Sequence, residues 1–340
     1  MCSKRIGRQT VIMQSPPLIA AGAAVVGNKE GEGPLRDTFD LISSDSYFGQ
    51  TTWEKAESTM LSRCFSLSCR KAGISTDEPD YVLAGDLLNQ CTSSTFALRG
   101  SGLPFLGLYG ACSTMAESLS LAAMLIDGGC ADTVCAMTGS HFCSAERQFR
   151  TPLEYGAQRT PTAQWTVTGA GSLILRKGGS GPCVTCVTTG KIVDAGITDA
   201  SNMGAAMAPA AFDTLKTHFT DTGRSYGYYD AVITGDLGDL GHDILEDLFA
   251  REGIRIPPVF TDCGKLMFDS TQDAHCGGSG CGCSASVLAG HILKCMQKGI
   301  WNRVLFAATG ALMSPTSSMQ GESIPGICHA VSIENITEAL

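Results

Sequence analysis

The sequence predicts an α/β protein built from two similar halves, and two repeated strings lead to this prediction. The string DYVLAGDL, which begins at Asp80, matches DAVITGDL, which begins at Asp230. A longer unit of loop, helix and strand that starts at Gly110 recurs from Gly282. Landmarks that recur in the same order along a chain indicate an internal duplication.

A Gly- and Pro-containing linker, residues 177–182, separates the two repeated parts. The predicted domains are therefore residues 1–177, with Cys112 at a helix N-terminus, and residues 183–340. The length of 340 residues agrees with this division, because it exceeds one ordinary hydrophobic core.

Hydrophobic periodicity predicts the elements in chain order. Strands are expected at residues 10–13, 16–26, 80–84, 103–109, 133–141, 167–175 and 183–187. Helices are expected at residues 53–72, 89–99, 115–126 and 210–219. Residues 144–161 are polar and irregular and are expected to form a long loop, a kind of segment that is often functional.

The chain is organised around residues 103–141, which place Cys112 at the mouth of a helix. Thr114 and Glu117 have capping-box spacing, so we expect the helix to begin at Met115. A thiol at a helix N-terminus faces free backbone N–H groups and the positive end of the helix dipole. Both favour the thiolate, and the same N–H groups can hold an oxyanion or a carboxylate.

The composition argues against a nucleic-acid-binding, a membrane-spanning and a secreted protein. A net charge of −9 and a pI of about 5.1 argue against a nucleic-acid partner. No stretch reaches the roughly 18 uninterrupted apolar residues of a membrane-spanning helix. Residues 16–26 lack the flanks of a signal peptide. We therefore expect a cytoplasmic protein.

The 16 cysteines are scattered through apolar runs, which is typical of buried free thiols in a reducing compartment. Cys183 with Cys186, and Cys281 with Cys283, have the spacing of zinc half-sites. Neither pair is accompanied by a second pair of ligands at the spacing of a zinc finger, so no metal is expected. The Gly-rich run at residues 277–282 lacks the Lys-Ser/Thr of a phosphate-binding loop, so no nucleotide cofactor is expected either.

A duplicated α/β chain with a helix-mouth cysteine in its first half resembles the thiolase superfamily. This resemblance implies a thiolase-like fold, in which duplicated five-stranded mixed sheets are sandwiched by helices (αβαβα). The helices after Cys112 and Cys283 should pack side by side at the centre. More narrowly, the strings LYGACST, WTVTGAG, GITDASNMGAAMAPAA and GGSGCGCSA resemble the stage V sporulation protein AD family of spore-forming Firmicutes.

The narrower resemblance implies a component of the spore's dipicolinic-acid transport machinery that binds dipicolinic acid. It also implies a position peripheral to the inner membrane of the developing spore, in contact with membrane subunits of the same complex. Calcium can accompany dipicolinate as a counter-ion, and no other cofactor is implied.

The wider resemblance implies an alternative, an acyl-thioester transferase with Cys112 as the catalytic nucleophile. Such enzymes use two partners from the second half, His with Asn or His with His. Here Gly235 and Asp236 stand where one partner is expected, and Cys281 stands in place of the other; His275 fits only after a two-residue shift. One missing oxyanion donor costs about 10²–10³ in rate, so enzyme activity is not expected. A third hypothesis is a purely structural partner in a membrane assembly.

Dipicolinate carries two carboxylates, and the guanidinium fork of Arg147 or Arg150 suits a carboxylate. The alternative for both arginines is a surface ion-pair cluster with Glu146 and Glu154, and for Cys112 it is a buried, inert thiol. His141 follows a strand end, where ligands of α/β proteins collect. The residues expected to line the ligand site are Cys112, Ser140, His141, Arg147, Arg150, Cys281 and His329.

The resemblance also implies a homodimer. Thiolase-like chains pair through the edge strand of the first half, which is expected near residues 132–137 or in the neighbouring strand. Pairing with a second copy removes an open sheet edge, which is otherwise a liability.

Overall fold

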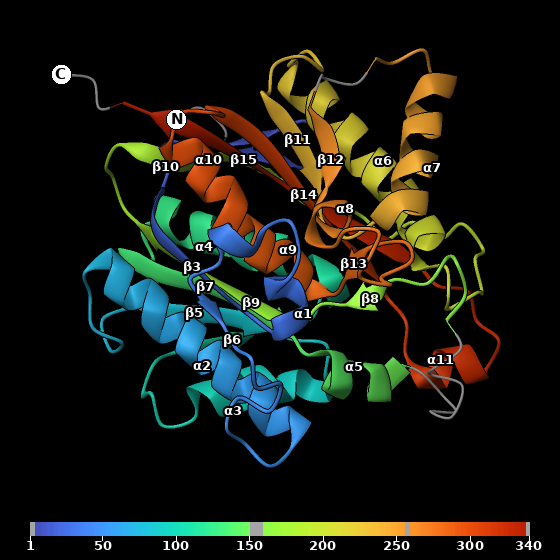
Figure 1. The fold of residues 1–340 in the computed structure, drawn as a ribbon. Coiled ribbons are helices and arrows are strands. Elements are labelled where there is room, and N and C mark those ends of the chain that lie inside the picture. Colours follow the sequence, from blue (N-terminus) through green and yellow to red (C-terminus); the bar gives the residue numbers. More distant parts are fainter. Residues whose placement is uncertain (1–3, 150–158, 256–258, 338–340) are drawn as a thin grey trace.

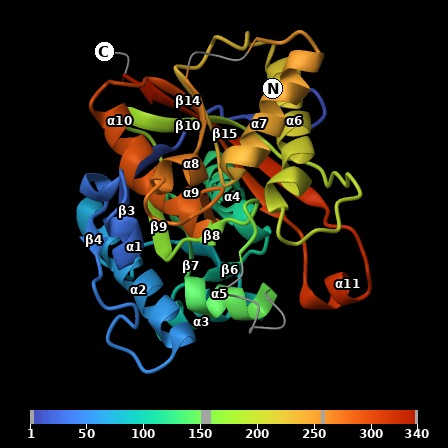
Figure 2. The same ribbon diagram turned by 45° about the vertical axis from the view of Figure 1, so that its right-hand side comes forward.

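Helices and sheets alternate in five layers in the computed structural model, which describes residues 4–149, 159–255 and 259–337 (Figure 1). Helices α2 (Trp53–Ala72) and α3 (Thr92–Leu98) cover the outer face of a first sheet. Helices α4 (Thr114–Asp127) and α9 (Cys281–Val287) form the central layer, and both views place them between the two sheets (Figures 1 and 2). Helices α6 (Met203–Thr222) and α7 (Gly238–Arg251) lie outside the second sheet.

Most of the described strands form one hydrogen-bonded network, within which each half of the chain has a sheet of five strands with the same pairing pattern. The first half has the order β3 (Leu18–Val26), β9 (Gly169–Arg176), β7 (Thr133–Ser140), β5 (Tyr81–Gly85) and β6 (Phe105–Gly107). The second has β10 (Gly181–Thr188), β15 (Gly326–Ile336), β14 (Arg303–Ala311), β11 (Ala231–Thr234) and β12 (Phe260–Asp262). In each set the first two pairings are antiparallel and the last two are parallel. The predicted thiolase-like fold class is confirmed.

Short elements complete the chain. The strands are β1 (Arg5–Ile6), β2 (Thr10–Ile12), β4 (Leu41–Ile42), β8 (Trp165–Thr166) and β13 (Gly278–Ser279). The helices are α1 (Asn28–Gly31), α5 (Phe142–Phe149), α8 (Cys263–Met267), α10 (Leu293–Gln297) and α11 (Pro315–Met319). The described residues also contain the 3-10 turns η1 (Arg36–Thr38), η2 (Asn89–Cys91) and η3 (Ala111–Ser113) and a π-helical turn, η5 (Leu288–Ile292).

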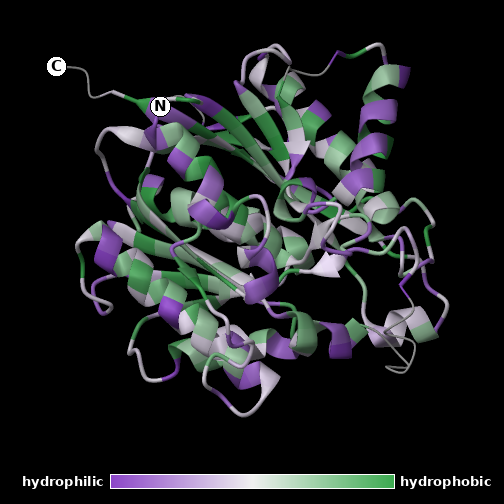
Figure 3. Cartoon of the chain, viewed as in Figure 1, coloured by the Kyte–Doolittle hydropathy of each residue, from purple (hydrophilic) through white to green (hydrophobic). Residues whose placement is uncertain are grey.

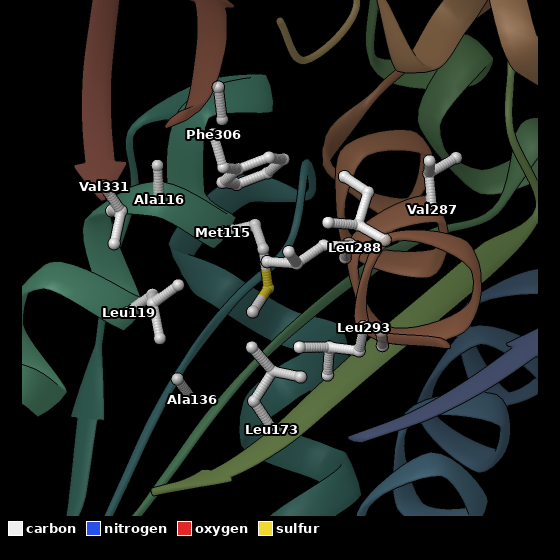
Figure 4. Close-up of a cluster of buried hydrophobic side chains, with 14 of the residues drawn as sticks. Met115, Ala116, Leu119, Ala136, Leu173, Val287, Leu288, Leu293, Phe306 and Val331 are labelled. Carbon is white, nitrogen blue, oxygen red and sulfur yellow. The ribbon is translucent and has the colours of Figure 1, made fainter. Parts of the chain in front are cut away.

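The largest hydrophobic cluster lies around the two central helices. Met115 and Leu119 of α4 meet Leu288 of η5, with Leu173 and Phe306 contributed by strands of the two sheets (Figure 4). The central strands and helices are predominantly apolar, whereas the outer side of α7 carries hydrophilic residues (Figure 3). The core therefore joins the two halves, since both sheets bury a face against the same pair of helices.

Helix α4 begins differently from the prediction. It starts at Thr114, directly after the 3-10 turn η3, and the expected capping box does not form. The Thr114 hydroxyl instead donates to the carbonyl of Ala111 (2.7 Å), and a carboxylate oxygen of Glu117 has no hydrogen-bond partner among the described residues. Ala111 has a φ of 49°, so the chain turns sharply into the helix and leaves no room for the capping geometry.

Two further expectations need correction. Residues 142–149 form helix α5 rather than the start of a long loop, while residues 150–158 lie outside the described part of the chain. Strand β7, which contains most of residues 132–137, is not an edge strand because β9 and β5 flank it on both sides. The edge strand of the first half is β6. The division of the chain at residues 177–183 into two superposable halves stays a prediction.

The first test concerns the contact between β9 and α9. Gly171 of β9 lies so close to α9 that a Cβ atom would overlap the backbone carbonyl of Ala285. Because neither backbone can shift without disturbing the central layer, we expect Gly171→Ala to lower the unfolding free energy by about 1–3 kcal/mol. Urea denaturation measures this change. Gly227→Ala is the matched control, since its Cβ would meet no atom within 4 Å; equal stabilities of the two variants would contradict the packing argument.

Candidate functional site

The candidate site lies where strand ends from both halves meet the first turns of the central helices. Asp236 follows β11, Cys112 lies in η3 before α4, and Cys281 opens α9. The side chains of Cys112 and Cys281 belong to one buried apolar cluster with Leu87, against which Phe149 packs. Cys112 is only 6% exposed, so the thiol is shielded from solvent.

Asp236 is the centre of the hydrogen-bond network in this site. One carboxylate oxygen accepts from the backbone N–H of Gly280 (2.9 Å) and the hydroxyl of Ser279 (3.2 Å). The other accepts from the hydroxyl of Thr309 (2.9 Å). The thiol of Cys112 interacts electrostatically with this carboxylate. Asp236 thus binds the cysteine of the first half to two segments of the second half.

The electrostatics of this arrangement favour a protonated thiol. Burial, together with the carboxylate of Asp236 and the neighbouring Cys281, raises the pKa of Cys112 well above its usual value. Burial likewise raises the pKa of Asp236 to about 6, although the hydrogen bonds it accepts oppose the shift. The expectation of a thiolate at the helix mouth is therefore wrong, because desolvation and a nearby carboxylate outweigh the helix dipole.

Ser140 and Cys281 lie beside each other at the start of α9. The thiol of Cys281 donates to the carbonyl of Gly139 (3.1 Å), and the hydroxyl of Ser140 accepts from the backbone N–H of Gly282 (3.1 Å). The structure therefore brings Ser140 and Cys281 together, and the apolar cluster adds Cys112 to them.

The two predicted histidines take part in other contacts. Nε2 of His141 donates to the carbonyl of Ser46 (2.8 Å), and its ring lies 5.4 Å from that of Trp53, on the side of α2. Nδ1 of His329 accepts from the backbone N–H of Gly190 (3.1 Å), and burial lowers the pKa of His329 to about 4. Both rings are therefore occupied by structural hydrogen bonds, and a ligand role for them stays a prediction.

Of the two predicted arginines, Arg147 lies in the described part of the chain. A guanidinium nitrogen of Arg147 lies 2.5 Å from the carboxylate of Glu54, and both side chains are more than 40% exposed. This is an ion pair on the protein surface, the alternative that the sequence left open, although with a different acidic partner. Arg150 lies outside the described residues.

A cavity of about 210 Å³ lies directly beside this network. Its lining is Glu146 and Phe149 of α5, Ala163, Gln164 and Thr166, the segment Ala200, Ser201 and Met203 at the N-terminus of α6, and Ser279. Ser279 also donates to Asp236, and the side-chain amide of Gln164 donates to the backbone carbonyl of Asp236 (2.7 Å). The cavity is therefore coupled to the Cys112–Asp236 pair through Ser279 and Gln164.

Sequence reasoning missed the lining of this cavity, because its members come from segments far apart in the chain. The sequence did carry a signal for the buried carboxylate next to the cavity, because a Gly-Asp dipeptide occurs at the end of β5 and again at the end of β11. Asp86 follows β5 as Asp236 follows β11, and it accepts from the backbone N–H and the hydroxyl of Ser94 (both 2.7 Å). A repeated Gly-Asp at two strand ends marks both carboxylates as buried hydrogen-bond acceptors.

More buried acid lies behind Cys281. Glu57 of α2 is fully buried and accepts from the hydroxyl of Ser144, and burial next to Asp86 raises the pKa of Glu57 well above its usual value. A carboxyl whose pKa is raised in this way is held toward its neutral form, so Glu57 adds a buried acid with little fixed negative charge. Among residues 4–149, 159–255 and 259–337, no three His, Cys, Asp or Glu side chains converge as a metal-binding group.

The fold and the buried cysteine at the start of the central helix define a thiolase-like protein. The 3-oxoacyl-[acyl-carrier-protein] synthase III of Aquifex aeolicus has a similar structure, with a TM-score of 0.57 and 12% identity, covering 94% of this chain and 99% of that one. A single-residue variant of OleA from Xanthomonas campestris gives a TM-score of 0.59 and 13% identity, covering 95% of this chain and 99% of that one.

The chain belongs to the Stage V sporulation protein AD (SpoVAD) family, whose profile matches residues 7–334. It is 42% identical over 331 residues to stage V sporulation protein AD of Bacillus subtilis (strain 168), covering 97% of this chain and 98% of that protein. It is thus a member of a sporulation protein family with a thiolase-like fold. None of the helices in the described part of the chain is both long and apolar enough to span a bilayer.

The pKa of Asp236 leads to a test of stability against pH. The folded-state pKa of about 6 lies above the ordinary value of 3.8, so the folded protein binds more protons than the unfolded chain between these values. The contribution of Asp236 to the unfolding free energy therefore falls as pH rises from about 4 to about 6, by up to about 1.4 kcal/mol per pH unit. We expect Asp236→Asn to remove this part of the slope in urea denaturation. Asp37→Asn, at a side chain that is 96% exposed, should leave the slope unchanged; equal slopes for the two variants would refute the buried carboxylate.

Proposed function

We propose that this protein binds dipicolinic acid as part of the spore's dipicolinate transport machinery, and that the ligand occupies the cavity between α5, β8 and α6. Membership of the sporulation family supports the biological setting. The observation that carries the site is the cavity itself, which joins an apolar wall to the polar side chains of Gln164, Thr166, Ser201 and Ser279. A flat aromatic ring with two carboxylates requires both kinds of surface.

The N-terminus of α6 supplies the positive potential that a carboxylate needs. This helix is 20 residues long and begins at Met203, with Ala200 and Ser201 also lining the cavity. The first turn of a helix presents backbone N–H groups, and the dipole adds the equivalent of about half a positive charge. On the opposite side, Phe149 offers an aromatic surface for the pyridine ring.

Acyl transfer at Cys112 is the weaker alternative. A nucleophilic cysteine must ionise, and here burial and the Asp236 carboxylate hold the thiol in its protonated form. The second-half position next to it carries Cys281, whose thiol already donates to a backbone carbonyl. A protonated thiol in a carboxylate network is suited to shape a site and not to attack a thioester.

The carboxylate of Glu146 in the cavity wall affects the charge with which a ligand can enter. Glu146 lines the cavity and accepts from the hydroxyl of Thr166 (2.9 Å). A carboxylate in the wall repels a second anion less when a cation enters with that anion. We propose that Ca²⁺ accompanies dipicolinate as cargo when the ligand enters.

The binding proposal is tested by isothermal titration of dipicolinate into single variants. Ser201→Ala should weaken binding about 2- to 10-fold, because its hydroxyl, which donates to Asp199 (2.7 Å) in the ligand-free protein, would turn to the ligand carboxylate. Glu146→Gln should strengthen binding of calcium-free dipicolinate, because a like charge is removed from the cavity. Glu322→Gln, an exposed change of the same type, is the control.

The same titration separates this cavity from the site expected from the sequence. In that alternative, Cys112→Ala, His141→Ala, Arg147→Ala and Arg150→Ala weaken binding while the cavity variants do not. Under our proposal, Arg147→Ala binds dipicolinate like the parent, since its guanidinium pairs with Glu54 on the surface. No measurable binding by the parent protein would refute the ligand assignment altogether.

We further propose that the protein is a homodimer that contacts membrane subunits of the same transport complex. Strand β6 is the last strand of its sheet, so its outer edge is open to a second copy. Leu106 of β6 and Tyr109 after it are 44% and 45% exposed, which adds apolar surface along that edge. Pairing of two β6 edges about a twofold axis would cover both features.

Leu106→Lys tests the dimer. Two copies of the new charge would lie close together across the twofold axis, so we expect the variant to be monomeric at micromolar concentration, where the parent is dimeric. Light scattering coupled to size-exclusion chromatography measures the mass of each. Ile300→Lys places the same charge on a distant exposed side chain and should remain dimeric; a monomeric parent would exclude the dimer.

A further inference from the structure

A groove with an excess of positive charge lies between α2 and α3, on the outer helical layer. Its walls are Gln50, Thr52, Glu54, Lys55, Ser58, Thr59, Thr92, Phe96 and Arg99, and its volume is about 630 Å³. A smaller hollow of about 230 Å³ continues it along α2 and adds Ser62, Arg63 and Ala97. We call these residues together the cationic groove. Nothing in the proposed dipicolinate site uses them.

The cations of this groove lack acidic partners. Lys55, Arg63 and Arg99 are exposed, and none forms an ion pair with any residue in the described ranges. The one acid in the wall, Glu54, is neutralised by Arg147. On a chain with a net charge of −9, a local cluster of uncompensated positive charge is well placed to attract an acidic partner.

The groove also contains an exposed aromatic anchor. Phe96 is 53% exposed, and the guanidinium of Arg99 lies 4.9 Å from the centre of its ring. Aromatic and arginine side chains together are typical of the residues that carry most of the energy of protein interfaces. The remaining walls are mainly hydroxyl groups, which can pair with the backbone of an entering chain.

We propose that the cationic groove binds an acidic peptide segment of a partner protein, with its carboxylates on Lys55, Arg63 and Arg99 and an apolar side chain on Phe96. From Thr52 to Arg63 the helix extends about 16 Å, which matches about five residues of extended chain. A second copy of this protein is a poor occupant, because two such grooves facing each other would repel. A flat bilayer does not fill a hollow sunk between two helices.

The test uses two labelled 12-residue peptides, (Glu-Glu-Leu-Glu)₃ and the uncharged (Gln-Gln-Leu-Gln)₃, in fluorescence anisotropy with the full-length protein. We expect saturable binding of the acidic peptide alone, weakened as salt rises. Lys55→Glu/Arg99→Glu should weaken it at least 10-fold, and Phe96→Ala at least 3-fold. Lys177→Glu/Lys298→Glu makes the same change of net charge outside the groove and should bind like the parent.

Three results would overturn the proposal. The first is no saturable binding of the acidic peptide at low ionic strength. The second is equal weakening by the two double variants, which would show only the effect of net charge. The third is binding of phosphatidylglycerol vesicles, but not of the peptide, that depends on Lys55 and Arg99. Circular dichroism checks that each variant is folded. Titration of dipicolinate into Lys55→Glu/Arg99→Glu tests the proposed dipicolinate cavity independently of the cationic groove.

Discussion

The burial of α4 and α9 between two sheets is the constraint on which the rest of this structure depends. Both helices are apolar on almost every side, so neither half can bury its own central helix without the other. The first turns of the two helices are consequently forced together. Cys112 from one half and Cys281 from the other then share a single buried cluster.

This enclosure sets the chemistry of the site. A helix N-terminus in water favours a thiolate, but here desolvation acts on the thiol and Asp236 lies within hydrogen-bonding reach. Because the carboxylate accepts from Gly280, Ser279 and Thr309 as well, it is held in place and keeps the thiol protonated. The thiolase-like scaffold thus has a buried cysteine at the start of its central helix, and the groups around that cysteine raise the pKa of its thiol.

The two proposals give this acidic chain two different ways to recognise anions. In the proposed dipicolinate site, polar side chains and the N-terminus of α6 would take the place of paired arginines. On the outer layer, the positive charges are concentrated between α2 and α3, well separated in sequence from the cavity residues. The two proposals thus assign a small anion and an acidic peptide to different kinds of surface.

The sequence by itself determined the features that depend on near neighbours. Helix α2 matches its expected bounds because Thr52 caps one end and Gly73, in the left-handed conformation, ends the other. The repeated strings predicted that the second half repeats the α/β units of the first, and the family resemblance placed Asp236 and Cys281 at the positions where partners of Cys112 are expected. Only the tertiary structure decided the protonation of Cys112, the surface pairing of Arg147, and the cavity between α5 and α6. Each of these depends on groups far apart in the chain, whose desolvation and charge act only after folding has brought them together.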